Sequence, residues 1–365
     1  MVYMVMFAFS TFFAYMASRA KDKGGVIFFS VIAVMIPCIM GGIRAPGVGS
    51  DTGTYALPHF WQAFYAEDFR SFIYGSNKLS RELGWSLVTY VSTKTFGSVN
   101  VNFFIYQLLT IPFVYIGAYR QRKRVPFPFT MLMFFLVYYN QTYNFMRQCI
   151  AASIIFMVLP ELESRKYIKF SVCVVIAAMF HTSALVALVY FLGFHWVITS
   201  RLNSMVRSAM LYGGMLLIFV TRYLIVIVTS MIPFLSQYAG FERYVDGMSY
   251  ATNGMLFGSL LMFSLYRPRA ERLFKDGSMY RFYRYNLLFN LMYRFTVNIS
   301  SVRILFYFSF VNVYLVASIP WLVRNKTMRV FYALSVIFVG LVYWYCVYIL
   351  RSELNGTWPY ITIIF

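Results

Sequence analysis

Long apolar runs alternate with short basic clusters along the whole chain. Runs such as Val330 to Leu350 approach 20 residues, which is the length that an α-helix needs to cross the roughly 30 Å hydrocarbon layer of a bilayer. Of the 365 residues, 60% are hydrophobic and only 12% are charged, about half the charged share of a typical soluble domain. The pattern predicts an all-α polytopic integral membrane protein.

The basic clusters orient these predicted crossings. By the positive-inside rule, short loops rich in Lys and Arg stay in the cytoplasm. The net charge of +20 therefore reflects membrane topology, and we expect membrane lipid, and no nucleic acid, as a partner. The clusters are Arg19 to Lys23, Arg120 to Arg124, Arg165 to Lys169, Arg201 to Arg207, Arg267 to Arg284 and Arg324 to Arg329.

The order of runs and clusters predicts about twelve crossings with both chain ends outside. An even number of crossings has to separate neighbouring cytoplasmic clusters, and we expect a single membrane domain over residues 1–365. External loops are expected at about residues 43–100 and 233–253. The expected crossings are Met1 to Met16, Gly25 to Gly42, Val101 to Tyr119, two within Val125 to Glu163, two within Phe170 to Ile198, Ser208 to Ile232, Gly254 to Tyr266, Tyr285 to Ile299, Ile304 to Leu322 and Val330 to Leu350.

One predicted hairpin is too short for two full crossings. Phe170 to Ile198 holds 29 residues, whereas two spans need about 40. Its turn near His181 should therefore lie below the outer surface, where protein or a watery cavity has to cover the broken helix. The other predicted hairpin, Val125 to Glu163, should turn near Asn144 to Arg147. We therefore expect a buried polar pocket on the external side.

Four arginines lie within or at the ends of apolar runs that contain no acidic residue: Arg147, Arg222, Arg294 and Arg303. An arginine at mid-membrane costs at least about 2.5 kcal/mol. Snorkelling to the interface is the structural alternative, and for Arg222 it stays open. Arg147 and Arg303 lie at external hinges with polar neighbours, which favours binding of an anion. Guanidinium groups grip phosphate oxygens in pairs, and a lipid-linked pyrophosphate would place its headgroup at this depth.

Two further features are candidate chemistry. His181 lies alone in an apolar stretch, so it is either a core residue or a group that orients phosphate or acts as a base. The external run Gly41 to Tyr55 carries Arg44 and Asp51 among glycines that let a ligand approach the backbone, although such loops are mostly turns. The aromatic segment Leu57 to Leu87 is either an interfacial amphipathic helix or a platform for sugar stacking.

The chemistry of the remaining groups narrows the expected cofactors. All four cysteines lie in apolar runs, so no disulfide framework is expected. No acidic cluster could hold a metal. We therefore expect neither a metal nor an organic cofactor, and arginines would neutralise the pyrophosphate as it leaves.

Five short motifs, in this order, resemble the EpsG family, which contains exopolysaccharide polymerases and is similar in role to the Wzy O-antigen polymerases. They are Gly42-Ile43-Arg44 with Val48-Gly49-Ser50-Asp51-Thr52 and Tyr55; Glu82-Leu83-Gly84-Trp85; Met146-Arg147-Gln148; Phe180-His181-Thr182-Ser183-Ala184; and Pro359-Tyr360 with Phe365. Ser50 departs mildly from the threonine expected there.

The resemblance implies a GT-C-like, metal-independent glycosyltransferase in the bacterial inner membrane. It would join oligosaccharide repeat units carried on undecaprenyl pyrophosphate, on the periplasmic face, and could work with a chain-length regulator. Carried onto this chain, the implied pyrophosphate contacts are Arg44, Arg147, Arg303 and Arg294, the implied catalytic residues Asp51, Glu82 and His181, and the implied substrate contacts Tyr55, Asn144 and Gln148. The resemblance leaves open which catalytic residue is the base.

Two alternatives use the same ligand. A flippase or transporter of lipid-linked oligosaccharide needs gates on both sides, and transporters commonly contain internal repeats. The sequence contains no convincing repeat between its halves, and its polar features gather on one face, which favours a one-sided enzyme. An O-antigen ligase would use a similar site.

Overall fold

The computed structural model describes residues 1–75, 82–214, 216, 250–274, 277–294 and 299–363. These residues are mainly helical, and among them β-pairing is limited to one isolated bridge, between Arg44 and Thr362. The chain divides into two compact units. The first unit comprises Met1–Leu185 and Leu334–Phe365, and the second comprises Val186–Ala333. The expectation of an all-α fold is confirmed, while that of a single membrane domain stays a prediction.

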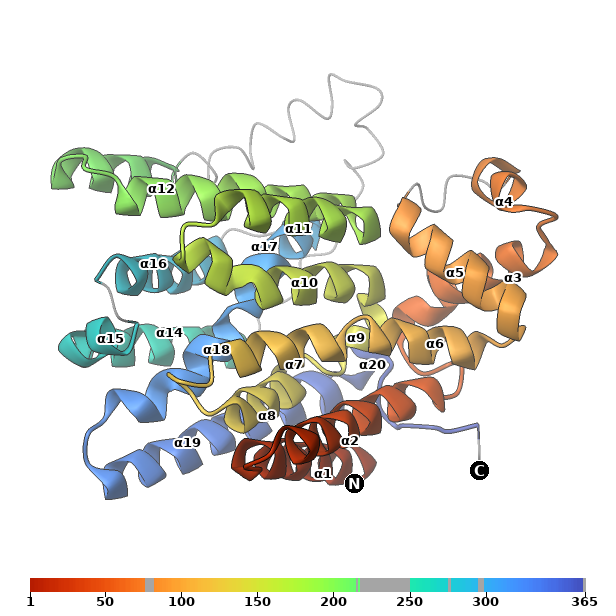
Figure 1. Cartoon of the computed structure of the whole chain (residues 1–365), viewed down its shortest axis with the longest axis horizontal. Helices are drawn as coiled ribbons and strands as arrows, with labels where there is room; N and C mark the ends of the chain where they lie inside the picture. The colour runs from red at the N-terminus through yellow and green to blue at the C-terminus, as the bar shows by residue number, and fades with distance from the viewer. Residues whose placement is uncertain (76–81, 215, 217–249, 275–276, 295–298, 364–365) are drawn as a thin grey trace. The chain divides into compact units, whose positions relative to one another are not determined.

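The first unit is a bundle in which α1, α2, α6, α7, α8 and α10 run side by side (Figure 1). Its elements are α1 (Val2–Arg19), α2 (Lys23–Gly42), η1 (Thr52–Ala56), α3 (Leu57–Tyr65), α4 (Phe69–Gly75), α5 (Leu83–Phe96), α6 (Val99–Leu108), α7 (Ile111–Arg120), α8 (Phe127–Val137), α9 (Gln141–Asn144), α10 (Met146–Glu163), α11 (Tyr167–Phe180), η2 (Thr182–Leu185), most of α19 (Lys326–Trp344), η6 (Tyr345–Ile349) and α20 (Ser352–Asn355).

The second unit packs around a buried asparagine. The Asn286 Nδ2 group donates hydrogen bonds to Phe308 O at 3.1 Å and to Asn312 Oδ1 at 3.0 Å, which joins α16, α17 and α18. Its elements are η3 (Leu188–Leu192), α12 (Gly193–Thr199), α14 (Tyr250–Leu265), α15 (Arg267–Leu273), α16 (Gly277–Arg294), α17 (Ile299–Phe310), α18 (Asn312–Ser318) and η5 (Ile319–Leu322). A buried amide has to be paired in this way because water is excluded from the core.

Five helical stretches of the described chain are long and apolar enough to cross a membrane: Lys23–Gly42, Val99–Arg120, Thr182–Thr199, Leu305–Leu322 and Lys326–Ile349. They support the prediction of a polytopic membrane protein, and the number of twelve crossings stays a prediction. The expected loop at about residues 43–100 is mostly helical where it is described, since it contains η1, α3, α4 and α5. The crossing expected at Ser208 to Ile232 and the loop at 233–253 fall largely outside the described residues.

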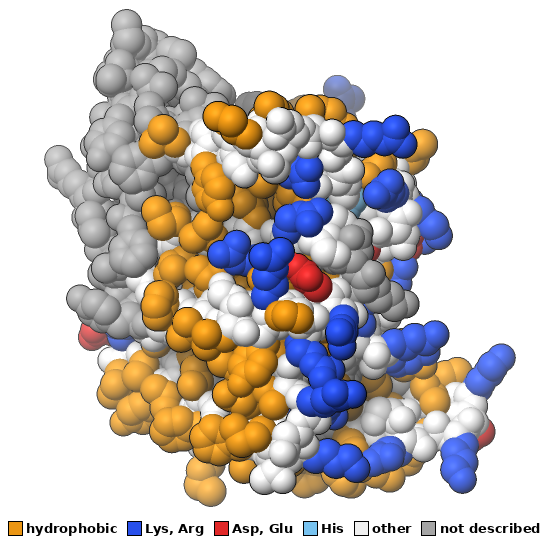
Figure 2. All heavy atoms as spheres, turned by 90° about the vertical axis from the view of Figure 1, so that its left-hand side faces the viewer, with side chains coloured by type: hydrophobic (Ala, Val, Ile, Leu, Met, Phe, Trp, Pro, Cys, Tyr) orange, Lys and Arg blue, Asp and Glu red, His pale blue; other side chains and the backbone are white. Residues whose placement is uncertain are grey.

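The basic loops of the first unit lie together at one end of its bundle. Glu161, in the last turn of α10, forms ion pairs with Arg120 at the end of α7 and with Lys169, the latter at 2.9 Å. Arg124 and Glu163 form a further pair at 2.7 Å. Figure 2, which faces the left-hand side of Figure 1, shows many Lys and Arg side chains and few acidic ones. The loops that the positive-inside rule assigns to one side of the membrane are therefore on one side of this unit.

The C-terminal segment returns to the opposite end and pairs with the loop that follows α2. Backbone hydrogen bonds join Gly49 N to Gly356 O at 2.7 Å, Ala45 N to Ile361 O at 2.8 Å and Ile363 N to Ile43 O at 3.0 Å. The Tyr3 hydroxyl donates to Thr357 O at 2.8 Å. We call residues 43–51 the Arg44 loop and residues 356–363 the C-terminal strap. The first and last parts of the sequence thus form one local structure.

Substitution of Gly49 tests how strongly the pairing of the Arg44 loop with the C-terminal strap depends on backbone geometry. Its φ of +102° is unfavourable for other residues, and a Cβ there would lie 2.9 Å from Thr52 Oγ1 and 3.0 Å from Asn144 Oδ1. Gly49→Ala should therefore lower the free energy of unfolding by about 1–3 kcal/mol. Gly47→Ala in the same loop is the control, because a Cβ at Gly47 meets nothing within 4 Å. Thermal unfolding of the two purified variants in detergent measures the difference, and equal stability would contradict the assigned strain.

Candidate active site

Glu82 brings together two residues that are far away in the sequence. Its Oε2 accepts a hydrogen bond from Arg147 Nη1 at 2.7 Å. Its Oε1 lies 2.5 Å from His181 Nδ1 and accepts from the backbone N–H of Thr182 at 3.0 Å. We call Glu82, Arg147 and His181 the Glu82 cluster. Three motifs that were separate in the sequence therefore form one site.

Local backbone geometry places each member of the Glu82 cluster. Glu82 has an extended conformation directly before α5, and Arg147 lies in the first turn of α10. His181 is extended and ends α11, so its side chain and the next N–H turn towards Glu82. A Cβ at Gly84 would lie 3.0 Å from both Cβ and O of Met179. Glycine at this position therefore allows α5 to approach the end of α11 closely.

The carboxylate of Glu82 is held in its ionised form. Its side chain is 9% exposed, and this burial alone would raise its pKa. The hydrogen bond from His181 and the charge of Arg147 outweigh burial, so the pKa of Glu82 lies below its ordinary value. An ionised carboxylate only accepts hydrogen bonds, so Nδ1 of His181 carries the proton that they share. Arg147 has an acidic partner although its apolar run contains none, because Glu82 arrives from outside the apolar runs.

Tyr55 connects η1 to the start of α10. Its hydroxyl donates a short hydrogen bond to Asn144 O and accepts one from Met146 N at 3.1 Å. The guanidinium of Arg147 lies over the Tyr55 ring, 4.7 Å from its centroid. A cation over an aromatic face is stabilised by the ring quadrupole. Tyr55 and Glu82 therefore both contact the guanidinium of Arg147.

Three further residues expected at the site, Asp51, Asn144 and Gln148, lie close to Tyr55 or to the start of α10. Asp51 precedes η1 and is partly exposed. Burial raises the pKa of Tyr55, and the charge of Asp51 adds to this rise while that of Arg147 opposes it. Asn144 is buried and donates from Nδ2 to Asn355 O at 2.8 Å. Gln148 is buried in the first turn of α10. The structure thus places Asp51, Tyr55, Asn144 and Gln148 near the start of α10, whereas contact with a substrate stays a prediction for each of them.

Arg44 is enclosed instead of exposed to a ligand. It is 1% exposed, and its guanidinium carbon lies 4.3 Å from the Phe103 ring centroid and 4.2 Å from that of Tyr143. Nη2 donates to Met146 Sδ at 3.6 Å, while Nε and Nη1 have no hydrogen-bond partner within the described part of the chain. A bound pyrophosphate could reach this group only if its aromatic neighbours or the C-terminal strap moved.

The other two arginines expected at the site, Arg294 and Arg303, belong to the second unit. Arg294 ends α16 and Arg303 lies in α17, but their side chains fall outside the described residues, as does the whole of Arg222. Their convergence with Arg147 stays a prediction. Among the described residues, no three His, Cys, Asp or Glu side chains form a group that could hold a metal ion.

His59 is a neighbour of this site that sequence reasoning missed. Trp85 Nε1 donates to His59 Nδ1 at 2.7 Å, and His59 is 4% exposed. Burial, assisted by the charge of Arg147 and opposed by that of Glu82, lowers the pKa of His59 to about 4. Because an indole N–H only donates, the proton of neutral His59 sits on Nε2. His59 lies in the aromatic segment that also contains Trp85, and the indole that follows Glu82 by three residues was the available signal.

The buried His59 should make the stability of the fold pH-dependent. Its pKa is about 4 when folded and 6.5 in its ordinary state, so between these values the unfolded chain binds more protons and stability falls as the pH falls. The loss should approach about 3 kcal/mol by pH 4. His59→Asn keeps an acceptor for Trp85 and removes the titration. Melting temperatures between pH 7 and 4.5 should therefore fall less steeply in the variant, and equal slopes would contradict a buried neutral His59.

Comparison with known proteins agrees with the motifs. The model of the EpsG family matches residues 27–362, nearly the whole chain. EpsG is a Wzy-like polymerase family. No curated protein and no solved structure matches the chain. The matched region includes the Glu82 cluster, the Arg44 loop and most of the C-terminal strap, and on this basis the chain belongs to the EpsG family.

Proposed function

We propose that this protein is an O-antigen or exopolysaccharide polymerase that joins undecaprenyl-pyrophosphate-linked repeat units by glycosyl transfer. The observation that carries the proposal is the Glu82 cluster, which combines an arginine, a carboxylate and a histidine at the end of the bundle remote from the basic loops. Arg147 and Glu161 lie in the first and last turns of α10, about 21 Å apart at 1.5 Å per residue. With the basic loops in the cytoplasm, the site faces the periplasm.

In this proposal, Arg147 binds the departing pyrophosphate. Its side chain is 20% exposed, and guanidinium binds phosphate oxygens in a fixed, paired geometry. Glu82 and the Tyr55 ring hold the guanidinium in place. Pyrophosphate leaves as an anion, so a positioned cation lowers the barrier without a metal. Arg294 and Arg303 stay proposed additional contacts, whereas the enclosed Arg44 is better assigned to support of its loop.

The geometry favours His181 as the base among the three candidates. Both oxygens of Glu82 already accept hydrogen bonds, and its low pKa makes it a weak base. Glu82 holds Nδ1 of His181, which leaves the Nε2 lone pair to take a proton and stabilises the imidazolium that results. The acceptor hydroxyl oxygen would bond to the anomeric carbon, its proton would go to Nε2, and pyrophosphate would leave with the electron pair of the broken C–O bond. Such a single displacement would invert the anomeric centre.

The proposal also includes the membrane topology of the chain and the depth of the site. The chain would cross the bacterial inner membrane about twelve times in a GT-C-like arrangement, with the site below the periplasmic surface. Support comes from the broken helix at His181, where α11 has only 14 residues before η2, and from the five apolar helices long enough to cross. A chain-length regulator would act as a separate partner.

The surface polysaccharide of a deletion strain tests the proposed function. A strain without the protein should keep single repeat units and lose the ladder of longer chains. Complementation with Arg147→Ala should fail to restore the ladder at a normal protein level, because Arg147 holds the leaving group. The matched control is Arg124→Ala, which removes another 2.7 Å Arg–Glu pair of similar exposure at the opposite end of the bundle.

Each result of this experiment has a distinct meaning. A restored ladder with Arg124→Ala but not with Arg147→Ala supports the polymerase and the site together. Loss of single repeat units in the deletion strain points to a flippase or a ligase. A normal ladder with Arg147→Ala would remove Arg147 from the proposed mechanism.

A comparison of three variants tests the assignment of the base. His181→Ala should keep fold and binding of the lipid-linked donor, and slow polymerisation by about 10²- to 10⁴-fold. Glu82→Gln should impair both binding and turnover, because Arg147 and His181 lose their common partner. Asp51→Asn should polymerise normally. Purified variants in vesicles with supplied lipid-linked repeat units provide the measurement, and an active His181→Ala with an inactive, stable Asp51→Asn would transfer the role to Asp51.

A further inference from the structure

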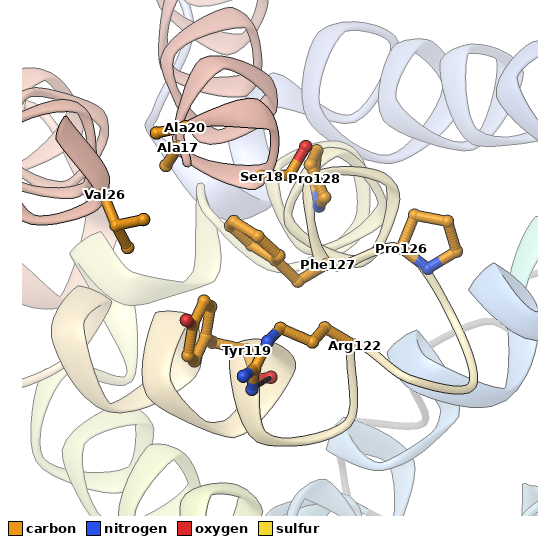
Figure 3. A pocket seen from close by; sticks show the side chains of 9 residues that line it. All are labelled: Ala17, Ser18, Ala20, Val26, Tyr119, Arg122, Pro126, Phe127 and Pro128. Carbon is orange, nitrogen blue, oxygen red and sulfur yellow. Dashed lines mark hydrogen bonds between the residues drawn. The ribbon is translucent and has the colours of Figure 1, made fainter. Parts of the chain in front are cut away.

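The end of the first unit remote from the Glu82 cluster contains a pocket that the polymerase mechanism does not use. It lies between the α1–α2 connection and the α7–α8 connection and has a volume of about 340 Å³ (Figure 3). One part of its wall is apolar, with Ala17, Val26 and Phe127, and another part carries Tyr119 and Arg122. Its size is at the lower end of small-molecule sites, which suits a headgroup better than a whole lipid or a sugar chain.

Arg122 is held at the pocket with part of its guanidinium open. Its Cζ lies 3.8 Å from the Tyr119 ring centroid, and Nη1 donates to Tyr119 O at 2.9 Å. Within the described chain, its Nε and Nη2 groups have no hydrogen-bond partner. Stacking on Tyr119 fixes the plane of the guanidinium, and a fixed plane suits phosphate oxygens.

The charges around the pocket are strongly unbalanced. Its two connections contribute Lys21, Lys23, Arg122 and Lys123 together with Arg19 at the end of α1. The two connections contain one carboxylate, that of Asp22, which accepts a hydrogen bond from Gly25 N at 2.6 Å and so caps α2. The nearby acids Glu161 and Glu163 already pair with Arg120, Lys169 and Arg124. An anionic ligand would therefore meet several cations that no other group neutralises.

The apolar side of the pocket continues into a surface suited to lipid. Val26 is followed on α2 by Ile27, Phe28 and Val31, whose exposed fractions are 62%, 60% and 54%. On α1, Phe12 is 52% exposed. In a membrane protein, such residues at the lengths of α1 and α2 face acyl chains. The pocket thus lies where a basic rim meets a lipid-facing surface.

We propose that this pocket binds the headgroup of an anionic phospholipid. The phosphate would accept hydrogen bonds from Arg122, with Lys123 and Lys21 adding attraction, and the glycerol and first acyl carbons would pack on Ala17, Val26 and Phe127. Basic pockets between membrane helices on the cytoplasmic side bind anionic headgroups by this combination of charge and apolar contact. The site is separate from the Glu82 cluster and does not depend on the proposed glycosyl transfer.

Lipid retention by the purified full-length protein tests this proposal. The protein is mixed with phosphatidylglycerol or phosphatidylcholine in detergent, and retained lipid is counted by native mass spectrometry. Wild type should retain phosphatidylglycerol in preference to phosphatidylcholine. The double variant Arg122→Gln/Lys123→Gln should weaken this retention by at least about tenfold. The control Arg165→Gln/Lys166→Gln removes the same charge from exposed positions of the α10–α11 loop and should retain the lipid.

A second variant separates the pocket from general attraction to the basic face. Ala20 lines the pocket and is not a charged residue, so Ala20→Phe should fill the pocket and reduce retention while leaving every charge in place. Retention that survives Ala20→Phe, or that falls equally in both double variants, would show attraction to charge alone and overturn the proposal. Equal retention of the two lipids by wild type would also overturn it, as would capture of a protein partner by this face without any bound lipid. Thermal unfolding of each variant confirms that it is folded.

Discussion

The first unit depends on one buried carboxylate having enough partners. Glu82 is nearly enclosed, and a buried charge is tolerated only when it is paired and its lone pairs are used. Arg147, His181 and the N–H of Thr182 satisfy both oxygens. Because these groups come from the start of α10 and the end of α11, Glu82 links the beginning of one helix to the end of the other. Removal of Glu82 would take away the carboxylate that pairs with the partly buried Arg147.

Two arginines near this site are stabilised in different ways. Arg147 pairs with a carboxylate and remains partly exposed, whereas Arg44 lies between two aromatic rings and is closed off by the C-terminal strap. The aromatic cage stabilises the charge of Arg44 without an anion. It also leaves two guanidinium nitrogens, Nε and Nη1, without a hydrogen-bond partner in the described chain, and buried donors without partners are unfavourable. The first arginine is therefore suited to a ligand and the second to holding a loop.

Acidic residues are few, and three of the described ones, Glu82, Glu161 and Glu163, form ion pairs within the first unit. Glu161 and Glu163 neutralise basic residues of the connections at one end of the bundle, and Glu82 neutralises an arginine at the other. The α1–α2 connection itself contains one acid, Asp22, which caps α2, beside Arg19, Lys21 and Lys23. The proposed headgroup site thus lies at the end of the first unit with surplus positive charge, whereas at the other end Glu82 compensates Arg147.

The sequence by itself determined the class of fold and the position of several breaks. Apolar runs of membrane length predict helices because a bilayer requires paired backbone groups, and α2 and α10 lie close to where the runs placed them. The turns expected near Asn144 and His181 also coincide with breaks between helices. Only the tertiary structure decided the pairing of Arg147 with Glu82, the enclosure of Arg44 and the role of His59. Each depends on contacts between residues tens to hundreds of positions apart, and hydropathy along a chain contains no information about which distant side chains meet.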